Sequence, residues 1–343
     1  MDYQNYIDGR WVASSDGKTF EQRNPANLEE VTGHWPKSTR EDAKQAIESS
    51  HAAFADWVGI GVHKRAEYLS KAVAVMKGRA EEIAAILTAE NGKTLNESRT
   101  EVSSAVREME FQIAQGVAMC GETVPSSTPG VFAYSVRRPV GVASIISPWN
   151  FPFNVPGRKC TPALISGNTI VFKPASLTPK AGKAFFDVFI EAGLPPGVLN
   201  FVAGGGGTVG EEMITNPLVE AISFTGSTGV GKSIQQSVAQ TLVRTQLELG
   251  GKNPAVIMED ADLDKAADAV ATAAYACAGQ WCTSTSRAIV VREVAEAFNA
   301  KLLERVKAIR VGDGRGDVDM GPVCGSDQLA SIMGYINIGQ EEG

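Results

Sequence analysis

Glu220-Ala221-Ile222-Ser223-Phe224-Thr225-Gly226-Ser227-Thr228-Gly229-Val230-Gly231-Lys232 is the stretch that sets the fold. Residues 220–224 predict a strand, the glycines after them predict a tight loop, and a helix is expected from Lys232 onward. The same change of pattern, from strand to turn to helix, recurs upstream in the chain. Strands that alternate with helices are typical of a parallel sheet.

The upstream strands of this sheet are expected over residues 141–146, 169–172 and 198–202, and a helix over residues 179–192. Thr178 is a suitable cap for that helix, and Pro179 suits its first turn. Ligands of open parallel sheets bind beside the carboxyl ends of the strands, where the glycines of this chain gather. We therefore expect a ligand site at that edge.

The flanking regions have other patterns. Residues 1–35 indicate short strands and turns, and residues 40–57 and 63–106 have the spacing of amphipathic helices. After a loop at residues 125–130, the alternation over residues 131–138 predicts an exposed strand. Further along, a helix is expected over residues 264–278 and a strand over residues 288–291.

Length and composition indicate a soluble globular protein of two or three domains. The chain has 343 residues, 43% hydrophobic and 21% charged, and a net charge of −7 without a basic block. We therefore expect neither nucleic acid nor a membrane as a partner. The five cysteines form no CxxC pair, and no signal peptide precedes them, so we expect a reduced, cytoplasmic protein without disulfides or a metal site.

The glycine loop has two further interpretations. Residues 226–233 satisfy the P-loop pattern G-x-x-x-x-G-K-[ST], and residues 255–260 resemble an apolar strand that ends in magnesium-binding acids. An ATP- or GTP-hydrolysing protein is therefore one alternative. A glycine turn that serves only tight packing of strand against helix is another. A dinucleotide would use the same helix N-terminus for its pyrophosphate.

Cys282 lies in Gly279-Gln280-Trp281-Cys282-Thr283-Ser284-Thr285-Ser286-Arg287, between the expected helix and strand. Small polar neighbours and a following cation favour the reactive thiolate, so Cys282 is a candidate nucleophile. The alternative is a buried structural cysteine. The three histidines all lie in the first 63 residues, away from this segment, which disfavours a Cys-His protease or acyltransferase.

Two further residues are candidates for chemistry. Glu248 stands between two leucines, so we expect a half-buried carboxyl with a raised pKa that serves as a general base; an exposed strand position is the alternative. Asn150, in Trp149-Asn150-Phe151, carries a side-chain amide whose common use in this position is to cap a turn before Pro152, and only the motif around it favours a functional role.

Four segments in this order resemble the NAD(P)-dependent aldehyde dehydrogenase superfamily: residues 146–152, 224–231, 247–254 and 279–287. The resemblance extends from Tyr6 to the last residue. It implies an α/β fold with a Rossmann-like parallel-sheet cofactor domain in residues 1–124 and 140–247. It further implies a small β oligomerisation arm at residues 125–139. Residues 248–343 would be the N-terminal part of a second α/β catalytic domain.

The resemblance also implies the reaction and its residues. An aldehyde would be oxidised to the acid with NAD or NADP, through a thiohemiacetal and a thioester on Cys282. Asn150 and the Cys282 N–H would form the oxyanion hole, and Glu248 would activate water. Cofactor contacts are implied for Ile146, Ser147, Pro148, Trp149, Lys173, Ser176, Gly206, Gly226, Ser227, Gly231 and Leu249.

Ser176 and Lys173 bear on the choice of cofactor. Many NAD-preferring relatives carry a glutamate at the position of Ser176, and Lys173 is implied to contact the adenosine ribose. An acid binds a ribose 2′-hydroxyl but repels a 2′-phosphate. We therefore expect that NADP is tolerated or favoured.

The substrate is indicated by fewer residues. Arg158 matches an arginine that semialdehyde dehydrogenases use for a substrate carboxylate, although Ala276 stands where those enzymes often have a second one. Trp281 either shapes the pocket or packs. The family continues past Gly343 with a segment that holds the nicotinamide ribose and with an oligomer-building strand. A homodimer or homotetramer is implied for a full-length chain, whereas irregular association and a non-catalytic remnant are the expectations for a shortened one.

Overall fold

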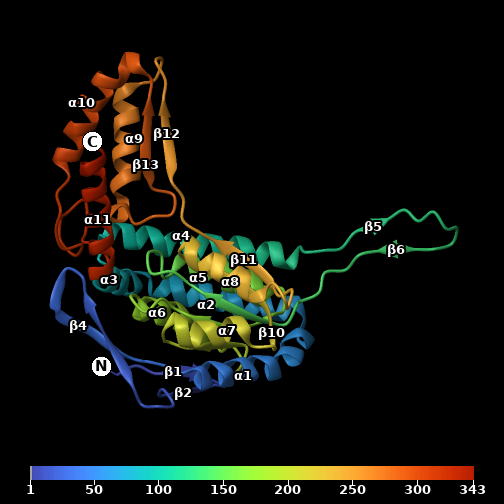
Figure 1. Ribbon diagram of the computed structural model, residues 1–343. Coiled ribbons are helices and arrows are strands. Elements are labelled where there is room, and N and C mark those ends of the chain that lie inside the picture. Colours follow the sequence, from blue (N-terminus) through green and yellow to red (C-terminus); the bar gives the residue numbers. More distant parts are fainter. Residues whose placement is uncertain (1) are drawn as a thin grey trace.

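The computed structural model describes residues 2–343 and places a seven-stranded sheet at the centre of the molecule (Figure 1). The strand order is β11-β10-β7-β8-β9-β1-β2. The five adjacent strands from β11 to β9 run parallel, which confirms the predicted parallel sheet. Strands β1 and β2 add an antiparallel edge. The strands are β1 (Asn5–Ile7), β2 (Arg10–Val12), β7 (Val142–Ile146), β8 (Thr169–Lys173), β9 (Leu199–Phe201), β10 (Val219–Thr225) and β11 (Arg244–Glu248).

The order of the strands reverses beside β7. From β7 the chain builds outward through β8 to β9, and then returns to form β10 on the other side of β7 and β11 beyond it. The carboxyl ends of β7 and β10 therefore lie next to each other at the point where the direction of winding changes. Such a switch point is where open parallel sheets bind ligands.

Alternate side chains of the strands enter two separate cores. Ala143, Ile145 and Phe172 pack with helices α2 (Gly61–Gly78), α3 (Ala80–Asn91), α4 (Leu95–Val117), α5 (Asn154–Ile165) and α6 (Pro179–Glu191). Val142 and Ile146 face the other way, toward α1 (Arg40–Gly59), α7 (Glu211–Thr215) and α8 (Thr228–Val238). Both faces of the sheet are buried, as the continuous apolar character of its central strands requires.

Several predicted helix boundaries need correction. The periodic region 63–106 is three helices, because Gly92 ends α3 in the left-handed conformation (φ 93°) and Thr94 and Glu97 begin α4 with a capping box. Helix α8 begins at Thr228 rather than Lys232, with Ser227 as its cap. Thr178 makes no capping hydrogen bond to α6; the buried carboxylate of Glu90 accepts those N–H groups instead.

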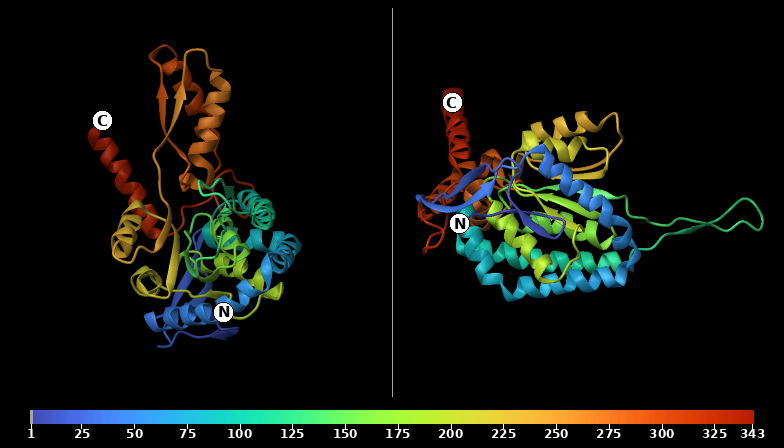
Figure 2. Two further views of the ribbon diagram at one scale, coloured as in Figure 1. Left: turned by 90° about the vertical axis from the view of Figure 1, so that its right-hand side faces the viewer. Right: turned by 90° about the horizontal axis from the view of Figure 1, so that it is seen from below.

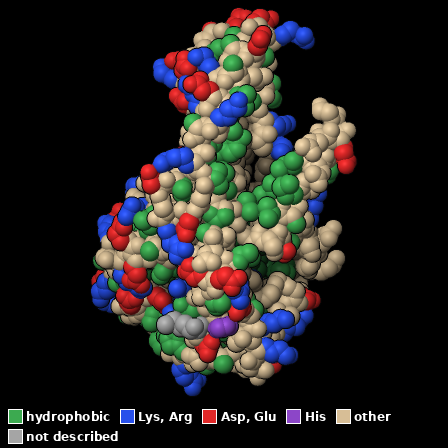
Figure 3. Space-filling model, turned by 90° about the vertical axis from the view of Figure 1, so that its left-hand side faces the viewer, with side chains coloured by type: hydrophobic (Ala, Val, Ile, Leu, Met, Phe, Trp, Pro, Cys, Tyr) green, Lys and Arg blue, Asp and Glu red, His purple; other side chains and the backbone are tan. Residues whose placement is uncertain are grey.

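A smaller unit stands above the sheet (Figure 1). It consists of the parallel strands β12 (Asn253–Ile257) and β13 (Thr285–Val290) and the helices α9 (Leu263–Tyr275) and α10 (Arg292–Ala308). Its core is formed by Ile257, Ala267, Val270 and Phe298. The C-terminal helix α11 (Ser326–Glu342) lies apart from this unit, and hydrophobic side chains are exposed along it (Figure 2, left; Figure 3).

Helix α9 is shorter than predicted. It ends at Tyr275, and a short 3-10 segment, η2 (Ala276–Gly279), follows. Cys277 and Ala278 take left-handed backbone angles (φ 52° and 55°), which non-glycine residues adopt at a cost of about 1–2 kcal/mol each. The chain therefore turns sharply just before the Cys282 segment.

The segment at residues 123–134, which overlaps the expected arm at residues 125–139, extends far from the body (Figure 1; Figure 2, right). The long strand predicted over residues 131–138 is wrong: only β6 (Ala133–Tyr134) forms, and it pairs with β5 (Thr123–Val124) of the same chain. At the other end of the sequence, where short strands and turns were expected, β3 (Thr19–Asn24) and β4 (Asn27–Pro36) make an antiparallel hairpin. Within residues 2–343, every helix is too short or too polar to cross a bilayer.

Candidate active site

Cys282 is exposed in the turn between η2 and β13. The side-chain amide of Asn253, the first residue of β12, donates to the carbonyl oxygen of Cys282 at 2.8 Å and to that of Ser284 at 3.0 Å. The loop is thus fastened to the neighbouring strand while the thiol remains accessible. The alternative of a buried structural cysteine is therefore wrong.

The other cysteines differ in accessibility. Cys160, Cys277 and Cys324 are buried, whereas Cys120 is exposed on the chain segment before the arm. Burial raises the pKa of Cys277 and of Cys324 to about 12, and it raises the pKa of Cys160 further. The three buried thiols are therefore protonated and unreactive at neutral pH.

Glu248 is the last residue of β11, the edge strand, and lies in register with Thr225 of β10. The expectation of a half-buried carboxyl is wrong, because the residue is exposed; Gln246 Nε2 donates to its Oε1 at 2.7 Å. Glu248, Cys282 and Arg158 line one cavity of about 700 Å³. The structure thus brings together three of the residues that the sequence indicated.

Lys159 lines the same cavity and was not identified from the sequence. Its ammonium donates to Ser223 Oγ and to Gln246 Oε1, both at 2.8 Å. Burial lowers its pKa to about 8, against the opposing charge of Glu248. The sequence offered one signal for Lys159, the two neighbouring cations at 158 and 159 on an expected helix. Adjacent residues of a helix point in different directions, so only one of the two can face the sheet.

Asn150 lies in the loop after β7 and contacts the loop that carries Cys282. Its Nδ2 donates to the carbonyl oxygen of Gln280 at 2.9 Å, and its Oδ1 accepts from the N–H of Phe151 at 3.1 Å. The rings of Phe151 and Trp281 lie 5.1 Å apart at 45°. The Asn150 side chain therefore stabilises its own turn through Oδ1 and contacts the loop of Cys282 through Nδ2.

The residues implied in cofactor binding all follow the carboxyl ends of neighbouring strands. Residues 146–149 end β7 and begin its loop, Lys173 ends β8, and Gly206 follows β9. Gly226 and Ser227 follow β10, Gly231 lies in α8, and Leu249 follows β11. The fold thus gathers them along the edge that contains the switch point.

Two of these residues tie the end of β8 to the next loop. Lys173 Nζ donates to the carbonyl oxygens of Pro174 (2.8 Å) and Gly204 (3.0 Å), and burial lowers its pKa to about 8. Ser176 Oγ donates to the same Gly204 carbonyl at 3.2 Å. The lysine is therefore fixed at the edge of the sheet.

This edge has features that fit a dinucleotide. The Ser147 hydroxyl is buried at the end of β7 and has no hydrogen-bond partner among residues 2–343. Buried hydroxyls are rarely left unpaired, so this one suits a bound ligand. Helix α8 follows β10, the neighbour of β7, so its N-terminus lies near the switch point. The free N–H groups of that N-terminus suit a phosphate.

The P-loop interpretation of residues 226–233 is wrong. Residues 228–231 are already helical, and the Gly231 N–H donates to Ser227 O at 3.0 Å instead of facing a loop. A Cβ on Gly231 would lie 2.6 Å from the Leu249 side chain, so this glycine also serves close packing. The acids at 259 and 260 follow β12, which belongs to a different sheet.

Comparisons with known proteins match both the sequence and the fold of this chain. Residues 11–343 match the aldehyde dehydrogenase family. The chain is 41% identical to alpha-ketoglutaric semialdehyde dehydrogenase of Bacillus subtilis, over 99% of this chain and 70% of that protein. An E. coli NADP-dependent enzyme superposes with a TM-score of 0.97 at 34% identity, over 100% of this chain and 71% of that one. The NAD+ complex of an aldehyde dehydrogenase from Bacillus cereus superposes with a TM-score of 0.97 at 32% identity, over 100% and 70%.

Proposed function

Because the chain belongs to the aldehyde dehydrogenase family, we propose that it oxidises an aldehyde that also carries a carboxylate, with Cys282 as the nucleophile. The chemistry of the family is oxidation of an aldehyde to the acid with NAD or NADP. The observation that carries the proposal is the cavity shared by Cys282, Glu248 and Arg158. A thiol, a carboxylate and a guanidinium there face the same space.

In the proposed reaction the Cys282 sulfur attacks the aldehyde carbon, and negative charge develops on the carbonyl oxygen. The Asn150 amide and the Cys282 N–H donate to that oxygen. When bound, the dinucleotide supplies the hydride acceptor. Glu248 then takes a proton from the water that attacks the thioester. Lys159 lines the same cavity as Glu248, and its pKa is lowered to about 8. Its Nζ is therefore a second atom that can hold or release a proton there.

The dinucleotide would be held at the carboxyl edge of the sheet. Ser147 would offer its unpaired hydroxyl, and the N-terminus of α8 at Ser227 would receive the pyrophosphate. Lys173 and Ser176 would lie at the adenosine ribose. The remaining contacts of this set would come from Ile146, Pro148, Trp149, Gly206, Gly226, Gly231 and Leu249.

Arg158 is the proposed partner of the substrate carboxylate. It extends from α5 into the cavity and is about half exposed, with Nη2 2.5 Å from Glu108 Oε1. A planar guanidinium has donors enough to serve Glu108 and a second carboxylate. The Bacillus subtilis relative, which is named for a semialdehyde substrate, supports this assignment. Ala276 supplies no second cation, so Arg158 carries the interaction alone in this proposal.

The substitution Arg158→Gln tests this assignment. The KM for a semialdehyde of a dicarboxylic acid should rise about 10- to 100-fold, the scale of one lost charge-assisted hydrogen bond, while the KM for an uncharged aldehyde of equal length changes little. Arg107→Gln, an exposed arginine of α4 bonded to Ser103, is the matched control. An equal rise for both aldehydes would contradict a carboxylate-binding role.

We further propose a domain division, a mode of association and a location for this chain. Residues 1–124 and 140–247 form the cofactor-binding unit, and residues 248–343 belong to a catalytic unit. The arm at residues 125–139 joins copies of the chain into a homodimer or homotetramer, which its exposed Phe132 and Tyr134 support. The location is cytoplasmic, which free thiols support. We propose no nucleic-acid or membrane partner.

A further inference from the structure

A fully buried ion pair lies behind the loop that carries Asn150. Lys93, between α3 and α4, and Glu101, in α4, have side chains that are 0% exposed, and Nζ lies 2.6 Å from Oε2. Burial acts to lower the pKa of Lys93, but the facing Glu101 carboxylate, together with Cys277 and Glu97, outweighs it, and the pKa of Lys93 is raised above its ordinary value. Because buried pairs are weak contributors to stability, the surroundings of this one indicate another role.

The pair and its neighbour Asn91 hold the backbone on both sides of the Asn150 side chain. Lys93 Nζ donates to the carbonyl oxygen of Asn150 at 2.7 Å, and Asn91 Nδ2 donates to that of Trp149 at 2.9 Å. Glu101 Oε1 accepts from the N–H groups of residues 153 and 154, at 2.9 and 3.0 Å. Since α5 has no cap from its own first residues, Glu101 also caps that helix from outside.

The first turn of α4 holds the nucleophile loop as well. Glu97, which caps α4 with Thr94, accepts from the N–H of Cys277 through its other oxygen at 2.7 Å. Cys277 is one of the two left-handed residues that turn the chain toward Cys282. One helix start therefore anchors the loop of the oxyanion donor and the loop of the nucleophile.

We propose that Lys93 and Glu101 are positioning residues that fix the Asn150 amide against the Cys282 loop. They act through the backbone of residues 150–154 and reach neither the thiol nor the carbonyl group of a substrate. The inference rests on the proposed roles of Asn150 and Cys282. It adds that the oxyanion donor is competent only while the buried pair holds its loop.

Two reactions of the same thiol separate this role from a general effect on folding. With p-nitrophenyl acetate, the thiolate sulfur attacks the ester carbonyl, an oxyanion forms, and the C–O bond breaks as p-nitrophenolate leaves with the electron pair. With iodoacetamide, the sulfur displaces iodide and no oxyanion forms. Neither reaction needs a cofactor. A misplaced Asn150 amide should slow the first reaction and spare the second.

The test variant is Lys93→Met/Glu101→Gln, which removes both charges and leaves neither one unpaired. Its ester acylation rate should fall about 10- to 100-fold, the scale of a misplaced or lost oxyanion donor, while alkylation of Cys282 stays near the wild-type rate. Asn150→Ala should show the same selectivity. Adding Asn150→Ala to the double variant should cause little further loss, because both changes remove the same interaction.

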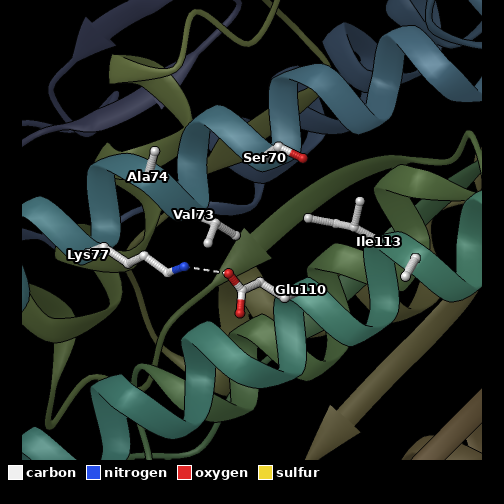
Figure 4. A pocket seen from close by; sticks show the side chains of 7 residues that line it. Ser70, Val73, Ala74, Lys77, Glu110 and Ile113 are labelled. Atoms are coloured by element: carbon white, nitrogen blue, oxygen red, sulfur yellow. Dashed lines mark hydrogen bonds and ion pairs between the residues drawn. The ribbon is translucent and has the colours of Figure 1, made fainter.

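The matched control is Lys77→Met/Glu110→Gln, an exposed pair that also joins α4 to a neighbouring element, here α2, in a surface pocket (Figure 4). It should leave both reactions unchanged. Asn91→Ala is a milder variant should the double variant fail to fold, with a smaller loss of the same selectivity. Equal slowing of both reactions or an unchanged ester rate in the double variant would overturn the proposal. It would also be overturned if the loss of ester rate in the triple variant equalled the product of the losses in the double variant and in Asn150→Ala. An ester reaction that persists in Cys282→Ser would instead refute the proposed nucleophile.

Discussion

Lys159 lies inside the candidate active-site cavity against two neutral oxygen atoms, those of Ser223 and Gln246. An ammonium in this position has lost much of its hydration without a carboxylate in hydrogen-bond contact. Its lowered pKa of about 8 follows from this burial. The residue can therefore exchange a proton around pH 8.

A stability measurement tests this environment. A lysine whose pKa is 10.5 in the unfolded chain and about 8 in the folded protein destabilises the fold when charged. The cost is fully present below pH 8 and disappears as the pH rises from 8 to 10.5. The free energy of unfolding of the wild type, relative to that of Lys159→Met, should rise across this window, by at most about 3 kcal/mol. Urea denaturation of both proteins at several pH values measures it, and a constant difference would contradict the buried, lowered-pKa lysine.

Single residues also show how far sequence patterns reach. Cys282 and Asn150 occur in specific motifs, and the structure places the amide of one against the loop of the other. For Glu248 the flanking leucines indicated burial, but β11 is an edge strand and the residue is exposed. Lys159 was missed because neighbouring cations at 158 and 159 cannot be told apart until the buried face of their helix is known.

At the scale of elements, the buried strands were predictable and many helix ends were not. Strands β7 and β8 are apolar on both faces, so each was predicted to within one residue. The cap of α6 comes from Glu90, about ninety residues upstream, and the cap of α5 comes from Glu101. Local sequence rules do not identify capping residues that belong to distant segments. For this reason Thr178 was predicted incorrectly as the cap of α6.

The end of β8 carries a prediction on cofactor choice. Ser176 is exposed there, close to the fixed ammonium of Lys173 through their shared Gly204 acceptor. Ser176→Glu should weaken NADP+ binding by about 1–3 kcal/mol and spare NAD+, because a carboxylate repels a 2′-phosphate but accepts from a 2′-hydroxyl. Calorimetric titration with both dinucleotides measures this, with the uncharged Ser176→Gln as the control. An equal loss for both cofactors would show that position 176 does not face the 2′ group.

For the whole molecule, the site is where two units meet. Asn150 follows β7 and Glu248 ends β11 of the seven-stranded sheet, and Cys282 belongs to the smaller unit with β12 and β13. The division into a cofactor-binding and a catalytic unit stays a prediction from the order of motifs along the chain. Their approach depends on contacts that periodicity cannot reveal, such as the hydrogen bond from Asn150 to Gln280 and that from the Cys277 N–H to Glu97.

The central claim is that Cys282 carries the acyl group, and trapping that group tests it most directly. In Glu248→Gln, thioester formation should proceed while its hydrolysis is slow, since the proposed base is absent. Acid quenching after mixing with NADP+ or NAD+ and a semialdehyde, followed by intact-mass and peptide analysis, should show one acyl group, on the peptide that contains Cys282. An adduct on Cys120, the other exposed thiol, or NAD(P)H formation without any protein adduct, would contradict the account.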